Sequence, residues 1–151
     1  MSADEAKAVV RAYWEHGLPG ALKGDPHALK EHLADDFVVH TDAHTRAGEG
    51  GVDDHYRALA EVTRAIPDVT PQVHRYIAEG DLVVAHWRLS GRHGGHHTHR
   101  LADGQLAPTQ APLEVTGITI YRVENGRIAE MWNHDNHIEA LIAAGALKVT
   151  G

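Results

Sequence analysis

The spacing of apolar residues divides the chain into a helical first half and an extended second half. Apolar positions recur every three to four residues over Ala3–Trp14, Asp25–Asp36 and Val52–Ile66, and this spacing predicts three helices. Pro67 ends the helical pattern, because proline lacks the N–H that a helix needs. A further helix is predicted near the end of the chain, over Ile138–Ala146.

After Pro67 the apolar residues alternate with polar ones, as they do in strands with one buried face. An earlier apolar stretch, Phe37–His40, is predicted to be a short strand as well. Residues 41–51 are interpreted as a loop, and residues 91–111 as a loop or the extension of a hairpin. The predicted strands of the second half are Thr70–Glu79, Leu82–Ser90, Leu113–Val123 and Arg127–His134.

The last two of these strands form a predicted hairpin within Ile118–Asn136. Asn125-Gly126 separates them, and this dipeptide is a strong signal for a two-residue hairpin turn. In a strand, residues two apart point to the same side. One face of the second strand therefore carries Ile128, Glu130, Trp132, His134 and Asn136, and the other carries Ala129, Met131, Asn133 and Asp135.

The first of these two faces combines an acid, an indole, an imidazole and an amide. Polar groups cost free energy when they are buried without partners, so a face that only packs a core does not need them. We interpret this face as the lining of a pocket. The alternative is a solvated polar face at the edge of the sheet.

The order of the predicted elements, helices first and strands after them, is typical of the α+β class. Such a chain packs helices on one face of a mostly antiparallel sheet, and the space between them suits a small molecule. We expect a single domain, residues 1–151, because this length suits one core and no linker or internal repeat interrupts it.

Composition excludes several classes of function. The net charge of −7 and the lack of a basic cluster argue against nucleic-acid binding. The absence of cysteine excludes disulfides, thiolate metal sites and a cysteine nucleophile. No signal peptide is visible, and no apolar run approaches the roughly 20 residues of a membrane-spanning helix. We therefore expect a cytoplasmic protein without nucleic-acid or membrane partners.

Short segments between about His32 and Leu147 follow one another in a distinctive order. They are Phe37-Val38-Val39-His40, Gly48-Glu49-Gly50, Ile66-Pro67-Asp68, Glu79-Gly80-Asp81, Gly91-Arg92-His93, Pro108-Thr109, Gly117-Ile118 and Gly126-Arg127-Ile128-Ala129-Glu130-Met131-Trp132. In this order they resemble the SnoaL-like polyketide cyclases, an ester cyclase family of the nuclear transport factor 2-like, or ketosteroid isomerase-like, superfamily.

The resemblance implies a cone-shaped barrel, with a bent sheet wrapped around the N-terminal helices and an internal pocket, and it implies a homodimer. Members of the superfamily include cyclases, isomerases, hydroxylases, epoxide hydrolases, dehydratases and non-catalytic binding modules. In the cyclases, an aspartate four residues after the tryptophan is the general acid/base, and no cofactor is needed.

This chain departs from that pattern. Asn136 stands four residues after Trp132, and Asp135 lies one residue earlier. In a regular strand Asp135 would point away from the pocket, whereas a bulge would turn it inward. An amide transfers no proton at neutral pH, so Asn136 is expected to orient a carbonyl group or to stabilise an enolate.

Proton transfer is then assigned first to His134, because the ordinary pKa of imidazole suits it. His40 and His93 match histidines of the family that the chain resembles. The expected pocket is lined by His40, His86, His134 and Asn136, with Trp132 as its apolar wall and Glu130 and His93 as further substrate contacts. For any one of these histidines, a structural or surface role is the competing interpretation.

The predicted function is a cofactor-independent acid/base conversion of a polyketide-like or other carbonyl compound, by cyclisation, isomerisation or dehydration. The 14 histidines support a second hypothesis, because neutral imidazole is a common metal ligand. In it a divalent metal is held by loop histidines, from the set His40, His44, His93, His96, His97 and His99, although no compact ligand motif is present. The third hypothesis is a module that binds a small molecule without converting it.

Overall fold

The computed structural model describes residues 1–40, 49–95 and 107–148. Its helical elements are α1 (Ala3–Ala12), the π-helical turn η1 (Tyr13–Gly17), α2 (Leu18–Leu22), α3 (Pro26–Lys30), α4 (Val52–Ala65) and α5 (His137–Ala143). Its strands are β1 (Leu33–His40), β2 (Glu49–Gly50), β3 (Thr70–Glu79), β4 (Leu82–Arg92), β5 (Pro112–Glu124) and β6 (Arg127–Asp135). None of the described helices has the length and apolar character needed to cross a membrane.

The helix predicted over Asp25–Asp36 is wrong in its second half. The side chain of Asp25 accepts a hydrogen bond from the His27 N–H (3.0 Å) and caps α3, which ends at Lys30. The next segment is instead the start of β1, where Leu33 pairs with Ile128 of β6. Leu29 and Leu33 are both buried, and their spacing of four imitates a helix although the second leucine belongs to a strand.

The strands form one sheet in the order β2-β1-β6-β5-β4-β3. β1 and β6 are parallel and all other neighbours are antiparallel, so the predicted mostly antiparallel α+β arrangement is confirmed. The predicted cone-shaped barrel is wrong in one respect: the sheet does not close, and β2 and β3 are its edges in the described part of the chain. Edge strand β3 contains Pro71 and an irregularity in its pairing between Val73 and Arg75.

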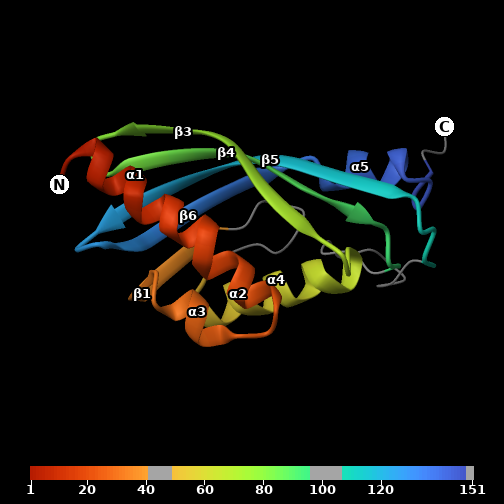
Figure 1. Cartoon of the computed structure of the whole chain (residues 1–151), viewed down its shortest axis with the longest axis horizontal. Coiled ribbons are helices and arrows are strands. Elements are labelled where there is room, and N and C mark those ends of the chain that lie inside the picture. The colour runs from red at the N-terminus through yellow and green to blue at the C-terminus, as the bar shows by residue number, and fades with distance from the viewer. Residues whose placement is uncertain (41–48, 96–106, 149–151) are drawn as a thin grey trace.

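The helices α1 to α4 lie on one side of the sheet, and α1 runs obliquely across the strands (Figure 1). The core lies between these two layers. Trp14 of η1 reaches the sheet, where its indole N–H donates to the Tyr121 hydroxyl (3.0 Å) and its ring lies 6.0 Å from that of Trp87. We call this side the inner face; it carries Val83, Ala85 and Trp87 of β4, Val115, Gly117, Thr119 and Tyr121 of β5, and Met131, Asn133 and Asp135 of β6.

The predicted turn between β5 and β6 is confirmed, since Asn125 and Gly126 both have positive φ (51° and 77°). A register shift follows in the hairpin: Arg122 pairs with Glu130, but Val123 pairs with Ile128. Because of this bulge, Ile128 is buried and does not share a face with the residues that follow it at spacings of two.

The face that was expected to line a pocket is therefore the outer face of the sheet, opposite to the helices. His134 is exposed, whereas Met131 on the other side of β6 is buried. The outer face carries His86 of β4, Ile118, Ile120 and Arg122 of β5, and Glu130, Trp132 and His134 of β6. The alternating pattern identified which residues lie together, and the structure places this set on the face away from the helices.

Candidate active site

A chain of side-chain hydrogen bonds crosses the inner face from β4 to the end of β6. The Trp87 indole N–H donates to Thr119 Oγ1 (2.9 Å), and the Thr119 hydroxyl donates to Asn133 Oδ1 (2.6 Å). The Asn133 amide then donates to Asp135 Oδ2 (3.2 Å). We call these four residues the inner-face chain, and it ends on a carboxylate.

The second carboxylate oxygen of Asp135 is also bound. Asp135 Oδ1 accepts a hydrogen bond from the backbone N–H of His137, the first residue of α5 (3.0 Å). Donors from a strand and from the start of a helix thus hold the two oxygens of one carboxylate. Two such donors define the orientation of the carboxylate group.

Gly117 lets this arrangement form. It pairs with Trp87 on β4 and with Asp135 on β6, so it lies between the two ends of the inner-face chain. A Cβ atom at this position would overlap the indole of Trp87 and would lie 2.6 Å from the carbonyl oxygen of His134. The missing side chain therefore leaves room for the indole, whose N–H reaches Thr119.

A second buried pair lies where η1 meets α4. The Tyr13 hydroxyl and His55 Nε2 are 2.7 Å apart, and both side chains are buried. Burial lowers the pKa of His55 to about 4 and raises that of the Tyr13 hydroxyl, because each charged form loses its solvation. Burial likewise raises the pKa of Tyr121. All three groups are therefore neutral at pH 7.

We expect His55 to make the fold sensitive to acid. Its pKa is lower in the folded chain than in the unfolded chain, so its contribution is complete above about pH 6.5 and is lost as the pH falls toward 4. At pH 5 the loss amounts to about 2 kcal/mol of the free energy of unfolding. Urea unfolding of the wild type and of His55→Gln at pH 7.5 and pH 5 measures it. The variant, which keeps an acceptor for Tyr13 but does not titrate, should lose about 2 kcal/mol less; an equal loss would contradict the prediction.

Three of the predicted site residues form a separate cluster on the outer face. His40 Nε2 lies 2.5 Å from Glu130 Oε2, and the His40 ring stacks on Trp132 with 5.1 Å between centroids. Arg122 Nε donates to the other oxygen of Glu130 (3.0 Å). The hydrogen bond to His40, followed by the one from Arg122, holds the pKa of Glu130 below its usual value. This cluster joins β1, β5 and β6 on the side away from the helices.

The other predicted residues are not brought together. His134 is exposed on the outer face, and the ring of His86 lies 5.2 Å from that of His74. Asn136 lies at the junction of β6 and α5, where its Oδ1 accepts a hydrogen bond from the Thr116 N–H (2.8 Å). Of the predicted site residues, Asp135 is the one that lies on the inner face, where it is bonded to Asn133 and His137.

His93 is buried beyond the end of β4. Its Nδ1 accepts from the Thr109 N–H (3.2 Å), while Nε2 has no hydrogen-bond partner within the described part of the chain. Burial lowers its pKa. Among the proposed metal ligands, His40 and His93 lie in different environments, and the described residues contain no group of three or more histidines or acids that could hold a metal. The other proposed ligands, His44, His96, His97 and His99, lie outside the described residues.

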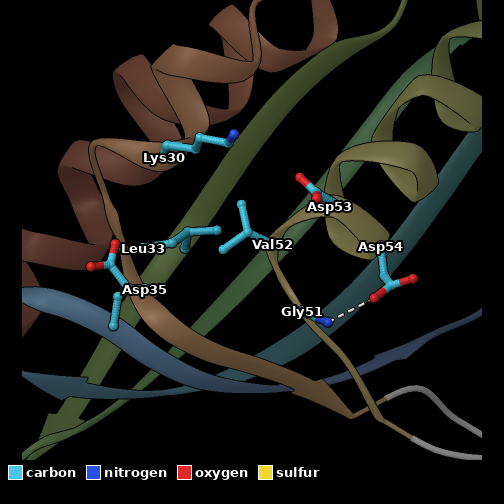
Figure 2. Close-up of a pocket in the computed structure, with 8 residues that line it drawn as sticks. Lys30, Leu33, Asp35, Gly51, Val52, Asp53 and Asp54 are labelled. Atoms are coloured by element: carbon cyan, nitrogen blue, oxygen red, sulfur yellow. Dashed lines mark hydrogen bonds between the residues drawn. The ribbon is translucent and has the colours of Figure 1, made fainter.

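A cavity of about 390 Å³ lies between the start of β1 and the start of α4. Leu33 and Val52 point toward each other within it, and Asp54 turns back to accept a hydrogen bond from the Gly51 N–H (2.8 Å; Figure 2). The remaining lining residues are Lys30, Ala34, Asp35 and Asp53. None of the predicted site residues lines it, and its Asp54 caps a helix.

Sequence reasoning missed Trp87, Thr119, Asn133, Tyr13 and His55. The available signal was the strict alternation of β4 and β5, which places the first two on one face together with buried aliphatic residues. Asn133 was identified as a neighbour of Asp135 on one face of β6, but that face was not expected to meet the helices.

Comparisons with known proteins assign the chain to a family. Residues 8–143 match the SnoaL-like polyketide cyclase family. The crystal structure of IdmH, a proposed polyketide cyclase from Streptomyces antibioticus, is similar at 25% identity, with 93% of this chain and 98% of that chain covered and a TM-score of 0.72.

Two further structures show the same fold. AclR, a proposed hydroxylase from Streptomyces galilaeus, is 20% identical over 99% of this chain and 87% of its own, with a TM-score of 0.74. A nuclear transport factor 2-like protein from Burkholderia xenovorans is 17% identical over 95% of this chain and 98% of its own, with a TM-score of 0.63. No curated protein matches the chain significantly.

The family match covers nearly the whole chain, from within α1 to the end of α5. The chain therefore belongs to the SnoaL-like polyketide cyclase family and has the nuclear transport factor 2-like fold.

Proposed function

We propose that this chain is a cofactor-independent acid/base enzyme in which Asp135 moves a proton to and from a carbonyl compound. The observation that carries the proposal is the position of Asp135 at the end of the inner-face chain, with both carboxylate oxygens accepting hydrogen bonds. A carboxylate held in this way is preorganised as a general base.

The proposed reaction begins when Asp135 removes a proton from the carbon next to the carbonyl group, which leaves an enolate. The enolate carbon forms a bond to a second carbonyl carbon in a cyclisation, and the resulting alkoxide takes the proton back from Asp135. In an isomerisation the proton returns to another carbon. Asn136 is the proposed group that orients the substrate carbonyl. Its Oδ1 accepts a hydrogen bond from the Thr116 N–H, so its NH₂ group is the end that would donate to the carbonyl oxygen.

The proposed substrate is an apolar, ring-containing carbonyl compound. Asp135 lies on the same face of the sheet as a buried apolar core that includes Trp14, Trp87 and Met131. Sites for small molecules are mostly apolar with a few polar groups, and a base on this face fits that composition. The similarity to a proposed polyketide cyclase supports the same class of substrate. We also propose that the reaction belongs to secondary metabolism.

We expect the wild-type protein to accelerate the exchange of α-protons for deuterium in α-tetralone, a bicyclic aryl ketone, in D₂O at pH 7.5. The loss of the α-proton signal in ¹H NMR measures it, with an equal amount of heat-denatured protein as the control. Quenching of tryptophan fluorescence by the ketone without exchange would favour a binding module. Exchange at the control rate across a panel of aryl ketones would contradict the proposed function.

The same assay tests His134, to which proton transfer was first assigned. Because its side chain is exposed on the outer face, we expect His134→Ala to keep at least half of the wild-type exchange rate. A loss of more than about tenfold in a folded variant would return the proton transfer to His134, since removing a general base costs on the order of 100-fold or more.

The homodimer and the cytoplasmic location remain predictions. The outer face supports the first of them, because Ile118 is 46% exposed there beside the cluster of His40, Glu130 and Trp132. Exposed apolar groups on a sheet face suit a contact with a second copy of the chain.

A further inference from the structure

We propose that Thr119 and Asn133 are positioning residues, which orient the Asp135 carboxylate through a one-way series of hydrogen bonds that starts at Trp87. This inference rests on the proposed role of Asp135 as the base. It adds a function for the polar groups of Trp87, Thr119 and Asn133, which act on the base and not on the substrate.

The direction of the series follows from the chemistry of its first member. An indole N–H can only donate, so the Thr119 oxygen must accept from Trp87. The single hydroxyl hydrogen of Thr119 is then directed to Asn133. This bond requires the carbonyl end of the Asn133 amide to face Thr119, and the NH₂ end therefore faces Asp135. Trp87 thus occupies one lone pair of the Thr119 oxygen, and the bond from Thr119 to Asn133 sets which end of the amide meets the carboxylate.

Burial keeps this direction from reversing. Trp87 is 4% exposed and Thr119 is 1% exposed, so bulk water does not replace a lost partner of either group. If the Asn133 amide turned over, its NH₂ group would face the Thr119 hydroxyl hydrogen, and its carbonyl oxygen would face the Asp135 carboxylate. Two donors would then meet at Thr119 and two acceptors at Asp135. Each unpaired buried group carries a penalty, and the penalties add along the series.

The result is a carboxylate held by at least two donors. Asn133 holds Oδ2 from within β6, and the His137 N–H holds Oδ1 from the start of α5. Two fixed donors define the plane of the carboxylate and the direction in which it receives a proton. A base whose orientation is set before substrate arrives avoids the cost of reorganisation during the reaction.

The competing interpretation is that the series only stabilises the sheet, and Thr119→Val separates the two. Valine keeps the shape of threonine but removes the hydroxyl, so Asn133 is no longer oriented. We expect kcat for ketone exchange to fall on the order of tenfold with KM within about twofold, and the acidic limb of the kcat/KM profile to rise by about one pH unit. Thr119→Ser, which restores the hydroxyl, should return both to near the wild-type values.

Thr63→Val is the matched control. It removes a hydroxyl that donates to the Ala60 carbonyl within α4 (2.7 Å) and does not belong to the inner-face chain, so it should leave both readouts unchanged. Should Thr119→Val fail to fold, Trp87→Phe removes the first donor of the series and should move the acidic limb in the same direction by a smaller amount. Unchanged kcat and pH profiles in the folded variants would overturn the proposal.

A direct measurement separates this inference from the proposed function. In protein labelled with ¹³C at the aspartate carboxyl carbons, the Asp135 signal is assigned by its absence in Asp135→Asn, and its titration midpoint is followed by NMR. We expect the midpoint to rise by about one pH unit in Thr119→Val, even if no ketone is converted. A midpoint equal to the wild type would show that the series does not act on Asp135.

Discussion

Asp135→Asn is expected to reduce kcat/KM for α-proton exchange by at least about 100-fold, and by up to about 10⁴-fold, the range typical of losing a general base. Asparagine has nearly the same shape, and its single carbonyl oxygen can still accept from Asn133 or from the His137 N–H. It cannot take up a proton, so the loss concerns the chemical step. The measurement is the exchange rate under saturating and limiting ketone, with circular dichroism to check the fold.

The matched control for this change is Asp25→Asn. Asp25 caps α3 through the His27 N–H, and asparagine caps a helix about as well as aspartate. The control should keep wild-type activity and stability. If Asp135→Asn kept more than a tenth of the wild-type rate while folded, another group would have to transfer the proton, and the proposed role of Asp135 would be abandoned.

Gly117→Ala is expected to cost about 3 kcal/mol in the free energy of unfolding, at the upper end of the range for overpacked cores. The new methyl group would overlap the Trp87 indole and lie 2.6 Å from the carbonyl oxygen of His134, and a backbone atom cannot move away as a flexible side chain can. Displacing the indole also breaks its bond to Thr119, so exchange activity should fall together with stability. Urea unfolding and the ketone assay measure the two effects.

Gly51→Ser provides the comparison for that variant. A Cβ at Gly51 would lie 3.8 Å from the nearest atom, the Phe37 carbonyl oxygen, and serine is a favourable residue at the start of a helix. We expect its stability to stay within about 0.5 kcal/mol of the wild type. A Gly117→Ala protein as stable as the Gly51→Ser protein would show that the packing around Trp87 relaxes easily.

Much of the fold followed from local patterns because those patterns have local causes. The turn at Asn125-Gly126 needs two residues with positive φ, and these two residue types supply it. The strands of the hairpin and the first helix likewise follow from periodicity. The segment after Lys30 did not, because Leu33 joins a strand through pairing with Ile128, nearly a hundred residues away. The openness of the sheet is also a property of long-range pairing.

The site was harder to predict for a specific physical reason. Alternation along β6 separates Met131, Asn133 and Asp135 from Trp132 and His134, but it carries no information about which set meets the helices. That choice is made by α1 and η1, whose Tyr13 and Trp14 pack on the sheet. The many histidines drew attention to the outer face, whereas the polar groups that meet the helical layer are threonine, asparagine and aspartate.

The open edge at β3 has a consequence for how the protein behaves when it is concentrated. An edge strand exposes backbone N–H and C=O groups that can recruit a strand of another molecule and start aggregation. In β3 the proline at position 71 has no N–H to offer, and the irregular pairing between Val73 and Arg75 interrupts the regular ladder. Both features weaken strand-to-strand growth from this edge, so they protect the concentrated protein against fibril-like stacking.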